Sequence, residues 1–281
     1  MKEIHGLINR TINFSSIDGP GNRLVIFFQG CNFRCINCHN PQTMGNCVGF
    51  LQCGICIENC KNEALQNTGF SKEKCMGCDT CESVCPFNSD PRARFMTPEE
   101  VLQEFILPAS PFISGVTLSG GEATLHKEFI IKLRKLMNND TSLRDLTLFL
   151  DSNGSVSIWD EITPYIDGVM LDFKAFSSIK HKEITGVRNE TVLASIYNLY
   201  NKNKLWEIRI LILPGYNDDN FEINSIKMFL GDNAPKCRIR LIPFRKYGVR
   251  EPYNKVVEPD TKKVEQIKDL FRDAGFCVYV T

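Results

Sequence analysis

The group of residues best suited to chemistry is formed by Cys31, Cys35 and Cys38, which have the spacing CxxxCxxC. They follow the β-branched and aromatic run 23–28, which predicts a buried strand ending at Gly30. Three thiolates on one short loop suit an iron–sulfur cluster. A cubane of four irons held by three thiolates leaves one iron without a protein ligand. Because that iron could bind another molecule, we expect a reaction site at this loop.

A second group of cysteines carries an internal repeat. The cysteines at positions 53, 56 and 60 recur 25 residues later, at positions 78, 81 and 85. The second copy, from Cys75 to Cys85, has the spacing CxxCxxCxxxC and is followed by Pro86, which is typical of bacterial ferredoxins. In that run three thiolates bind one cubane and the fourth thiolate binds another.

The first copy of the repeat is imperfect, because Phe50 stands where a cysteine is expected and Lys61 replaces the proline. Cys47 lies three residues before Phe50 and can supply the missing ligand. Two clusters are then predicted, with these ligands: Cys47, Cys53, Cys56 and Cys85 for one, and Cys60, Cys75, Cys78 and Cys81 for the other. In the alternative, the cluster of the first copy has three ligands or is absent.

The composition of the 281-residue chain limits its class. Its net charge is zero and its pI is about 6.9, so nothing favours nucleic acid or a membrane as a partner. There is no apolar run of signal-peptide length at the N-terminus and no later one of membrane-spanning length, so we expect a soluble, cytoplasmic protein. Eleven of the 13 cysteines lie between Cys31 and Cys85, which indicates metal ligation. Cys237 and Cys277 lie in apolar runs and are expected to be core thiols.

Strands and helices are predicted to alternate after the cysteine-rich segment. One helix begins at the cap Thr97, with Pro98 in its first turn and Glu100 completing a capping box. Strands are expected at residues 115–118, 146–150, 168–174, 206–213, 238–243 and 276–280, and helices at 127–137, 192–201, 220–230 and 261–274. This order predicts an α/β fold with a parallel sheet that curls into a partial or full barrel.

Polar residues stand at the ends of these predicted strands, where the chemistry of such folds gathers. They are Glu122, Asp151, Asn153, Asp172, Lys174 and Arg209. Each one alone could be a helix cap or a salt-bridge partner. Together they would converge on the same mouth as the CxxxCxxC loop, which predicts a binding site around that loop.

The CxxxCxxC loop resembles the signature of the radical S-adenosylmethionine (radical SAM) superfamily, and Gly120-Gly121-Glu122 resembles its motif for the methionine amino group. Other runs are similar to the activating enzymes of glycyl radical enzymes: residues 18–23, 38–41, 151–154, 172–174, 185–189 and 213–218. The likeness covers nearly the whole chain. The cysteine-rich segment resembles the ferredoxin-like domain that some of these activases carry, most closely those of the YjjW type.

The resemblance implies a partial (β/α)6-type radical SAM barrel, formed by residues 1–45 and 93–281, with a ferredoxin-like insert at residues 46–92. It implies an oxidoreductase whose [4Fe-4S] cluster on Cys31, Cys35 and Cys38 binds S-adenosylmethionine at its open iron. Reductive cleavage would give methionine and a 5′-deoxyadenosyl radical, which abstracts hydrogen from a backbone glycine of a partner glycyl radical enzyme. A low-potential electron donor such as flavodoxin or ferredoxin and two further [4Fe-4S] clusters in the insert are also implied.

The resemblance also implies which residues contact the cofactor. They are Gly120, Gly121, Glu122, Asp151, Ser152, Asn153, Asp172, Lys174 and Arg209. The Gly-Gly-Glu run would hold the amino group. Lys174 and Arg209 would pair with negative groups of the ligand, because a carboxylate in a dry pocket needs a fixed cation. Asp151 and Asp172 match positions at which related activases bind a monovalent cation beside the cofactor.

Three positions depart from the family pattern. Asn37 stands before the third cysteine where an aromatic residue is usual, Ala123 replaces a proline, and Arg245 stands where a histidine is common. None of these changes removes a cluster ligand. Three alternative functions are considered: a radical SAM enzyme acting on a small molecule or on another protein residue, a polyferredoxin electron carrier, and a zinc-stabilised binding protein in which His39 joins the cysteines.

Overall fold

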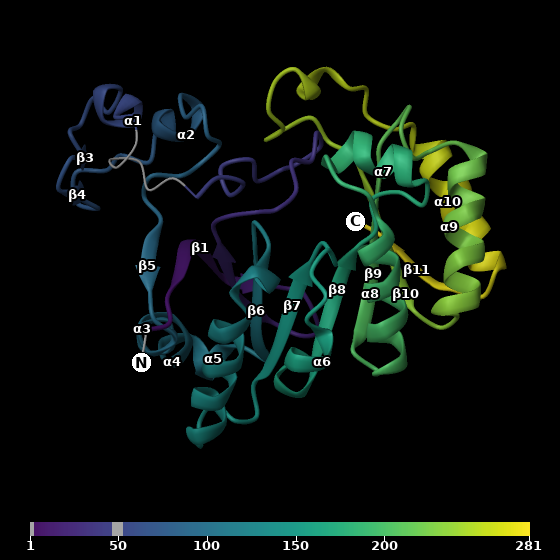
Figure 1. The fold of residues 1–281 in the computed structure, drawn as a ribbon, viewed down its shortest axis with the longest axis horizontal. Coiled ribbons are helices and arrows are strands. Elements are labelled where there is room, and N and C mark those ends of the chain that lie inside the picture. Colours follow the sequence, from purple (N-terminus) through teal and green to yellow (C-terminus); the bar gives the residue numbers. More distant parts are fainter. Residues whose placement is uncertain (1–2, 47–52) are drawn as a thin grey trace.

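A nine-stranded sheet organises the described part of the chain, residues 3–46 and 53–281 of a computed structural model. Its order is β11-β10-β9-β8-β7-β6-β2-β1-β5, and the strands from β11 to β2 run parallel (Figure 1). The parallel strands are β2 (Arg23–Phe28), β6 (Gly115–Gly120), β7 (Thr147–Ser152), β8 (Gly168–Asp172), β9 (Leu205–Ile212), β10 (Arg238–Pro243) and β11 (Cys277–Val280). The edge strands do not pair with each other in these residues, so the barrel is partial.

Two strands of the sheet are absent from the sequence-based prediction, β1 (Gly6–Ser15) and β5 (Arg94–Met96). β1 runs antiparallel to β2 on one side and to β5 on the other. The first three residues of β1 and its last residue, Ser15, are buried, whereas Ile12 and Phe14 are exposed. The strand therefore lacks the apolar run that identifies its buried neighbours.

The predicted helices are confirmed within a few residues as α5 (Lys127–Asn139), α8 (Glu190–Asn201), α9 (Asn220–Asn233) and α10 (Thr261–Asp273). The predicted capping box is also present, because the Glu100 N–H donates to Thr97 Oγ1 (3.2 Å) and the Thr97 N–H donates to Glu100 Oε2 (2.7 Å). The capped helix α3 (Pro98–Val101) continues through the π-helical turn Leu102–Ile106 into α4 (Leu107–Ala109). Two further helices, α6 (Trp159–Ile162) and α7 (Ser178–Thr185), were not predicted.

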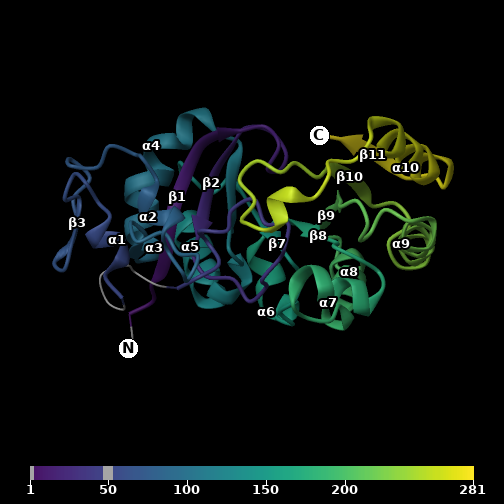
Figure 2. The same ribbon diagram turned by 90° about the horizontal axis from the view of Figure 1, so that it is seen from above.

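The two faces of the sheet have different neighbours. Leu24, Ile26 and Phe28 of β2 belong to the main hydrophobic core, to which α5 and α8 also contribute. Figure 2 shows that α5, α6 and α8 lie outside the curve of the strands. The alternate residues Val25 and Phe27 point to the opposite, concave face. No helix in the described ranges is long and apolar enough to cross a membrane.

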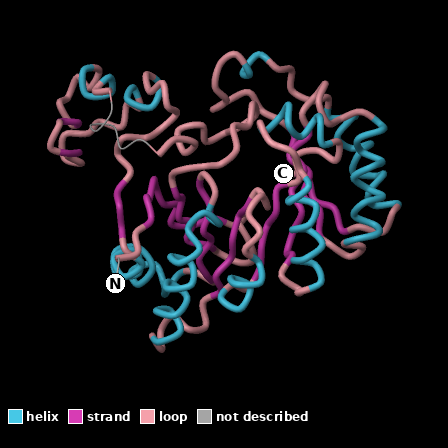
Figure 3. The backbone as a smooth tube through the Cα atoms, in the orientation of Figure 1, coloured by secondary structure: helices cyan, strands magenta, loops and turns pink. Residues whose placement is uncertain are grey.

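The cysteine-rich segment contains little regular structure, as Figure 3 shows. Its elements are α1 (Ile55–Glu58), β3 (Leu65–Gln66), β4 (Gly69–Phe70) and α2 (Thr80–Ser83). Outside this segment, Cys237 is buried as expected. The expectation that Cys277 is a core thiol is wrong, because its side chain is exposed on the edge strand β11.

Arg23 at the start of β2 is fully buried and joins three strands. Its guanidinium donates to Thr117 Oγ1 (3.1 Å), the Val116 carbonyl (2.6 Å), and both the Oγ1 (2.5 Å) and the carbonyl (3.2 Å) of Thr147. No carboxylate of the described residues forms a salt bridge with it, and burial lowers its pKa to about 10. Neutral oxygens therefore stabilise the Arg23 cation at the amino-terminal ends of β2, β6 and β7.

Replacing Arg23 by alanine should lower the free energy of unfolding by about 3 kcal/mol, because it leaves a cavity and several unpaired buried oxygens. Urea denaturation of the chain measures the change. Arg94→Ala is the control, since the Arg94 side chain is 51% exposed and its ion pair with Glu104 lies on the surface. Its effect should stay within about 1 kcal/mol. Equal effects of the two substitutions would show that the Arg23 contacts do not stabilise the sheet.

Candidate cluster and cofactor site

The CxxxCxxC loop follows the carboxyl end of β2 and is fixed on both sides by backbone hydrogen bonds. The Arg34 and Ile36 N–H groups donate to the carbonyls of Thr185 and Ile184 at the end of α7 (2.8 and 2.9 Å). The Cys31 N–H donates to the carbonyl of Met44 (3.1 Å). The structure brings Cys31, Cys35 and Cys38 together along one wall of a cavity of about 390 Å³.

The three thiols of this loop suit a bound metal cluster. Burial raises the pKa of Cys31 and of Cys35 to about 12 and that of Cys38 to about 11. Thiolates in such surroundings therefore need a cation bound to them. His39 lines the same cavity, and its Nε2 lies 2.8 Å from the Arg245 carbonyl, a hydrogen bond that would compete with metal binding at that nitrogen. In residues 3–46 and 53–281 no three His, Cys, Asp or Glu side chains are arranged around a single-ion site.

Gly120 and Gly121 bring the end of β6 against the start of the cysteine loop. The Gly121 N–H donates to the Phe28 carbonyl and the Glu122 N–H donates to the Gly30 carbonyl, both at 2.9 Å. A Cβ atom at Gly120 would lie 2.1 Å from the Phe28 carbonyl oxygen, and one at Gly121 would lie 2.1 Å from that of Gly30. This close approach of the two backbones by itself requires glycine at both positions.

The Glu122 carboxylate is buried and accepts four hydrogen bonds from the protein. Its Oε1 accepts from the Thr124 N–H (3.0 Å), Thr124 Oγ1 (2.5 Å) and Ser152 Oγ (2.8 Å), and its Oε2 accepts from the Asn153 N–H (2.7 Å). Burial raises the pKa of Glu122, while these donors favour the carboxylate. Glu122 thus links the end of β6 to the end of β7.

Asn153 lies between the cofactor cavity and the cysteine loop. Its Nδ2 donates to Asn32 Oδ1 (3.0 Å) and lies 3.9 Å from Cys31 Sγ, within the range of a weak N–H···S contact. The Phe33 N–H also approaches Cys31 Sγ, at 3.4 Å. These donors would favour negative charge on the sulfur.

Partly buried ion pairs line the mouth of the barrel, and they come from the ends of β7 and β8 and from the interior of β9. Lys174 Nζ lies 2.7 Å from Asp172 Oδ2, and Arg209 Nη1 lies 3.3 Å from Asp151 Oδ1. Burial opposes the charged forms of Lys174 and Arg209, yet the nearby carboxylates outweigh it and raise the pKa of both. These two cations, expected to pair with a ligand, therefore already have carboxylate partners in the protein.

Sequence reasoning did not identify two further carboxylates around Arg209. Glu207 Oε1 lies 3.1 Å from Arg209 Nε, and Asp18 Oδ1 lies 3.8 Å from Arg209 Nη2. Glu207 stands two residues before Arg209 on β9, so the strand alternation that places both side chains on one face could have indicated it. Asp18 comes from the loop between β1 and β2 and lines the cavity.

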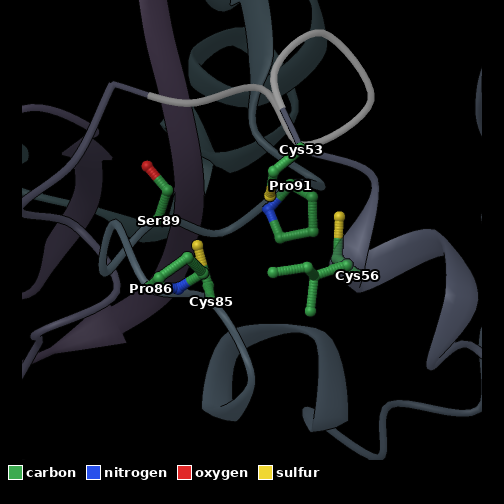
Figure 4. A pocket seen from close by; sticks show the side chains of 7 residues that line it. Cys53, Cys56, Cys85, Pro86, Ser89 and Pro91 are labelled. Atoms are coloured by element: carbon green, nitrogen blue, oxygen red, sulfur yellow. The ribbon is translucent and has the colours of Figure 1, made fainter.

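The cysteines of the insert gather around two cavities. Cys53, Cys56 and Cys85 line the first, which Figure 4 shows with Pro86, Ser89 and Pro91 beside them. The second is lined by the other four described cysteines of the insert: Cys60, Cys75, Cys78 and Cys81. This grouping matches the ligand sets expected from the repeat. Cys47, the fourth ligand expected at the first cavity, lies outside the described residues.

The Asp151 carboxyl should make folding depend on pH. Burial raises its pKa to about 6 from an ordinary 3.8, although Arg209 opposes the shift. Folding then favours the protonated form, so this group stabilises the fold below about pH 4 and its contribution disappears as the pH rises through 6. Between pH 4 and 6 the chain should lose up to about 3 kcal/mol relative to the variant Asp151→Asn.

Thermal unfolding of the metal-free chains at several pH values measures this difference. Asp160→Asn is the control, because Asp160 is 81% exposed and pairs with Lys202 on the surface. A parallel pH dependence for the wild type and Asp151→Asn would contradict the buried-carboxyl explanation.

Known proteins resemble this chain in sequence and in fold. The 4-hydroxyphenylacetate decarboxylase activating enzyme of Clostridioides difficile is 29% identical over 99% of this chain and 97% of its own length. The pyruvate formate-lyase-activating enzyme of Streptococcus mutans is 28% identical over 99% and 95%. A radical SAM methyltransferase from Sphaerobacter thermophilus shares the fold, with a TM-score of 0.58 and 12% identity over 99% of this chain and 77% of its own. The family model of the radical SAM superfamily matches residues 25–223, and the chain therefore belongs to that superfamily.

Proposed function

We propose that this protein activates a glycyl radical enzyme. Two relatives matched over nearly their whole length are named as activating enzymes, one for 4-hydroxyphenylacetate decarboxylase and one for pyruvate formate-lyase. The observation that carries the proposal is one cavity lined by the three loop cysteines, Gly120-Gly121-Glu122 and the ion pairs of Asp172 with Lys174 and of Asp151 with Arg209. A [4Fe-4S] cluster would be held by Cys31, Cys35 and Cys38, with S-adenosylmethionine in the cavity beside it.

When bound, the cluster and S-adenosylmethionine would supply the radical chemistry: one electron from the reduced cluster would cleave the sulfonium to methionine and a 5′-deoxyadenosyl radical, which would take a hydrogen atom from a backbone glycine of the partner. The protein's own part is to bind, orient and exclude water. The end of β6, from Gly120 to Glu122, contributes backbone to the cavity wall because no side chain fits at the glycines. Glu122 adds a negative charge to the cavity wall; its Oε1 already accepts three protein donors and its Oε2 accepts one.

The charges that line the cavity favour a cationic ligand. Four carboxylates line it, whereas two cations do: Asp18, Glu122, Asp151 and Asp172 against Lys174 and Arg209. The sulfonium and ammonium groups of S-adenosylmethionine would be attracted by this excess of negative charge. The same excess of negative charge would attract a monovalent cation near Asp151 and Asp172. Ser152 and Asn153 support the wall through their contacts with Glu122.

The insert at residues 46–92 is proposed to hold two further [4Fe-4S] clusters. The two cavities lined by its cysteines support this assignment. These clusters would pass electrons from a low-potential donor such as flavodoxin or ferredoxin to the cluster of the first loop. A cytoplasmic location would suit both the donor and the free thiols.

Electron paramagnetic resonance tests the proposed function. The chain, reduced anaerobically with S-adenosylmethionine and a glycyl radical enzyme, should produce the doublet of a glycyl radical on the partner. Cys35→Ser should abolish both the doublet and the release of 5′-deoxyadenosine, because it removes a cluster ligand. Replacing the partner's radical-bearing glycine by alanine should remove the doublet alone.

The second candidate is a radical SAM enzyme that acts on a small molecule or on another protein residue. It requires the same cavity, and the full-length matches to activating enzymes favour the first proposal over it. Cleavage of S-adenosylmethionine without a glycyl radical on any of the partner classes named by the relatives would support this second function.

Iron analysis tests the clusters of the insert. Three cubanes would give about 12 iron and 12 sulfide per chain after anaerobic reconstitution. Cys47→Ser should reduce this to about 8 if Cys47 completes the first insert cluster. Cys277→Ser is the control, since that exposed thiol lies outside the cysteine-rich segment and its loss should change nothing. About four iron in the unmodified chain would contradict both insert clusters.

A further inference from the structure

Arg92 lies at the end of the insert and lines its second cavity, together with Cys60, Cys75, Cys78 and Cys81. It is the one cationic residue among the described residues that line this cavity, and its side chain is 18% exposed. The described lining of the first cavity, whose seven side chains Figure 4 shows, contains no charged residue. A fixed positive charge therefore distinguishes the second cavity from the first.

Three carboxylates hold the Arg92 guanidinium in place. Its Nε lies 2.8 Å from Asp90 Oδ1, its Nη1 lies 2.9 Å from Asp79 Oδ1, and its Nη2 contacts Glu82 Oε1. Asp79 stands at the N-terminus of α2 and Glu82 lies within this helix. Each of the two directly follows a cysteine that lines the cavity. Arg92 therefore binds the segment that carries two of the four cysteines.

Asp90 connects this network to the barrel. Its N–H donates to Gln29 Oε1 (3.2 Å) and to the Gln42 carbonyl (3.0 Å), and its carbonyl accepts from Gln29 Nε2 (3.1 Å). The Asp90 carboxylate accepts from Asn9 Nδ2 of β1 at 3.4 Å. Because Gln29 directly follows β2, Arg92 and Asp90 together fix the second cavity relative to the sheet.

The charge of Arg92 matters because its surroundings are acidic. A cubane held by four thiolates is already an anion, and its reduction adds a further negative charge. The carboxylates of Asp79, Glu82 and Asp90 oppose that reduction, whereas the guanidinium favours it. The other cationic residues in the described part of the insert are exposed, so water and salt screen their charges: Lys61, Lys72 and Lys74.

We propose that Arg92 is a positioning residue for the second insert cluster: it holds the segment of Cys78 and Cys81 on the barrel and raises the reduction potential of the cluster. The proposal rests on the insert clusters of the proposed function. The step it concerns is the transfer of one electron from a flavodoxin or ferredoxin, in which the donor is oxidised, the cluster is reduced, and no bond forms or breaks. Without the guanidinium, a donor of given potential would reduce the cluster in fewer chains.

A redox titration followed by electron paramagnetic resonance tests the proposal without turnover. The reconstituted chain is reduced stepwise with titanium(III) citrate at one fixed pH. In Arg92→Gln the ratio of reduced to oxidised second cluster at a given potential should fall about tenfold, equivalent to about 59 mV for one electron. The potentials of the other two clusters should stay unchanged. Arg92→Lys keeps the charge, so its ratio should remain within about threefold of the wild type.

Two further measurements assign the signals to the three clusters. Addition of S-adenosylmethionine should change only the signal of the cluster on the CxxxCxxC loop, because that cluster has the open iron. The same titration of Cys53→Ser, which removes a ligand of the first insert cavity, identifies the signal of the second insert cluster.

The matched control is Arg94→Gln. Arg94 stands two residues after Arg92, its side chain is 51% exposed, and it lines neither insert cavity. Because solvent screens this charge, its removal should change each ratio by less than about twofold.

Asp79→Asn tests the same charge balance with the opposite sign, and it decides the case if Arg92→Gln does not assemble the second cluster. Asp79 has a φ of 55°, a conformation that asparagine also accepts, so the backbone should be preserved. Removing this carboxylate should raise the ratio of reduced to oxidised second cluster, because it leaves more of the Arg92 charge uncompensated.

The possible results separate this inference from the proposed function. About four iron per unmodified chain contradicts the insert clusters themselves. About 12 iron, with a second-cluster potential in Arg92→Gln equal to that of the wild type, contradicts the role of Arg92 alone. If Arg92→Gln lacks the cluster, an unchanged potential in Asp79→Asn overturns the inference as well.

Discussion

The buried carboxylate of Glu122 is the interaction on which the site depends. A charge without water must be compensated by nearby donors, and here the donors come from two separate parts of the sheet. Thr124 follows β6, while Ser152 and Asn153 stand at the end of β7. Because the carboxylate needs all of them, it holds the ends of the two strands together. The Glu122 N–H also donates to the Gly30 carbonyl, and this hydrogen bond fixes the start of the cysteine loop.

A second constraint arises from charge balance inside the barrel. Arg209 lies among Asp18, Asp151 and Glu207, and Lys174 pairs with Asp172. Removing one member of such a group would leave another buried charge unpaired, which is costly. The network therefore keeps the strand ends of β7, β8 and β9 in place before any ligand enters. Burial raises the pKa of Asp151, the carboxylates of Asp172 and Asp18 add to the shift, and Arg209 opposes it.

Several features of the site follow directly from the sequence, and others do not. Alternating strands and helices place all parallel strand ends at one mouth, which is why Asp151 and Asp172 could be grouped in advance. Arg209 joins them from inside β9, where it lies opposite Asp172 of β8. The cysteine sets of the insert could be divided because the spacing repeats. The strand β1 could not be identified, since its Ile12 and Phe14 face solvent. Cys277 was misjudged because edge position depends on the order of strands in the sheet, which local sequence does not contain.

The attachment of the insert gives a physical reason for its position. Thr43 and Met44 accept hydrogen bonds from Gly30 and Cys31 in the cluster loop, and Thr43 also forms an isolated β-bridge with Ser89. Ser89 lines the cavity of Cys53, Cys56 and Cys85. One short stretch thus contacts the radical SAM loop on one side and the first insert cavity on the other.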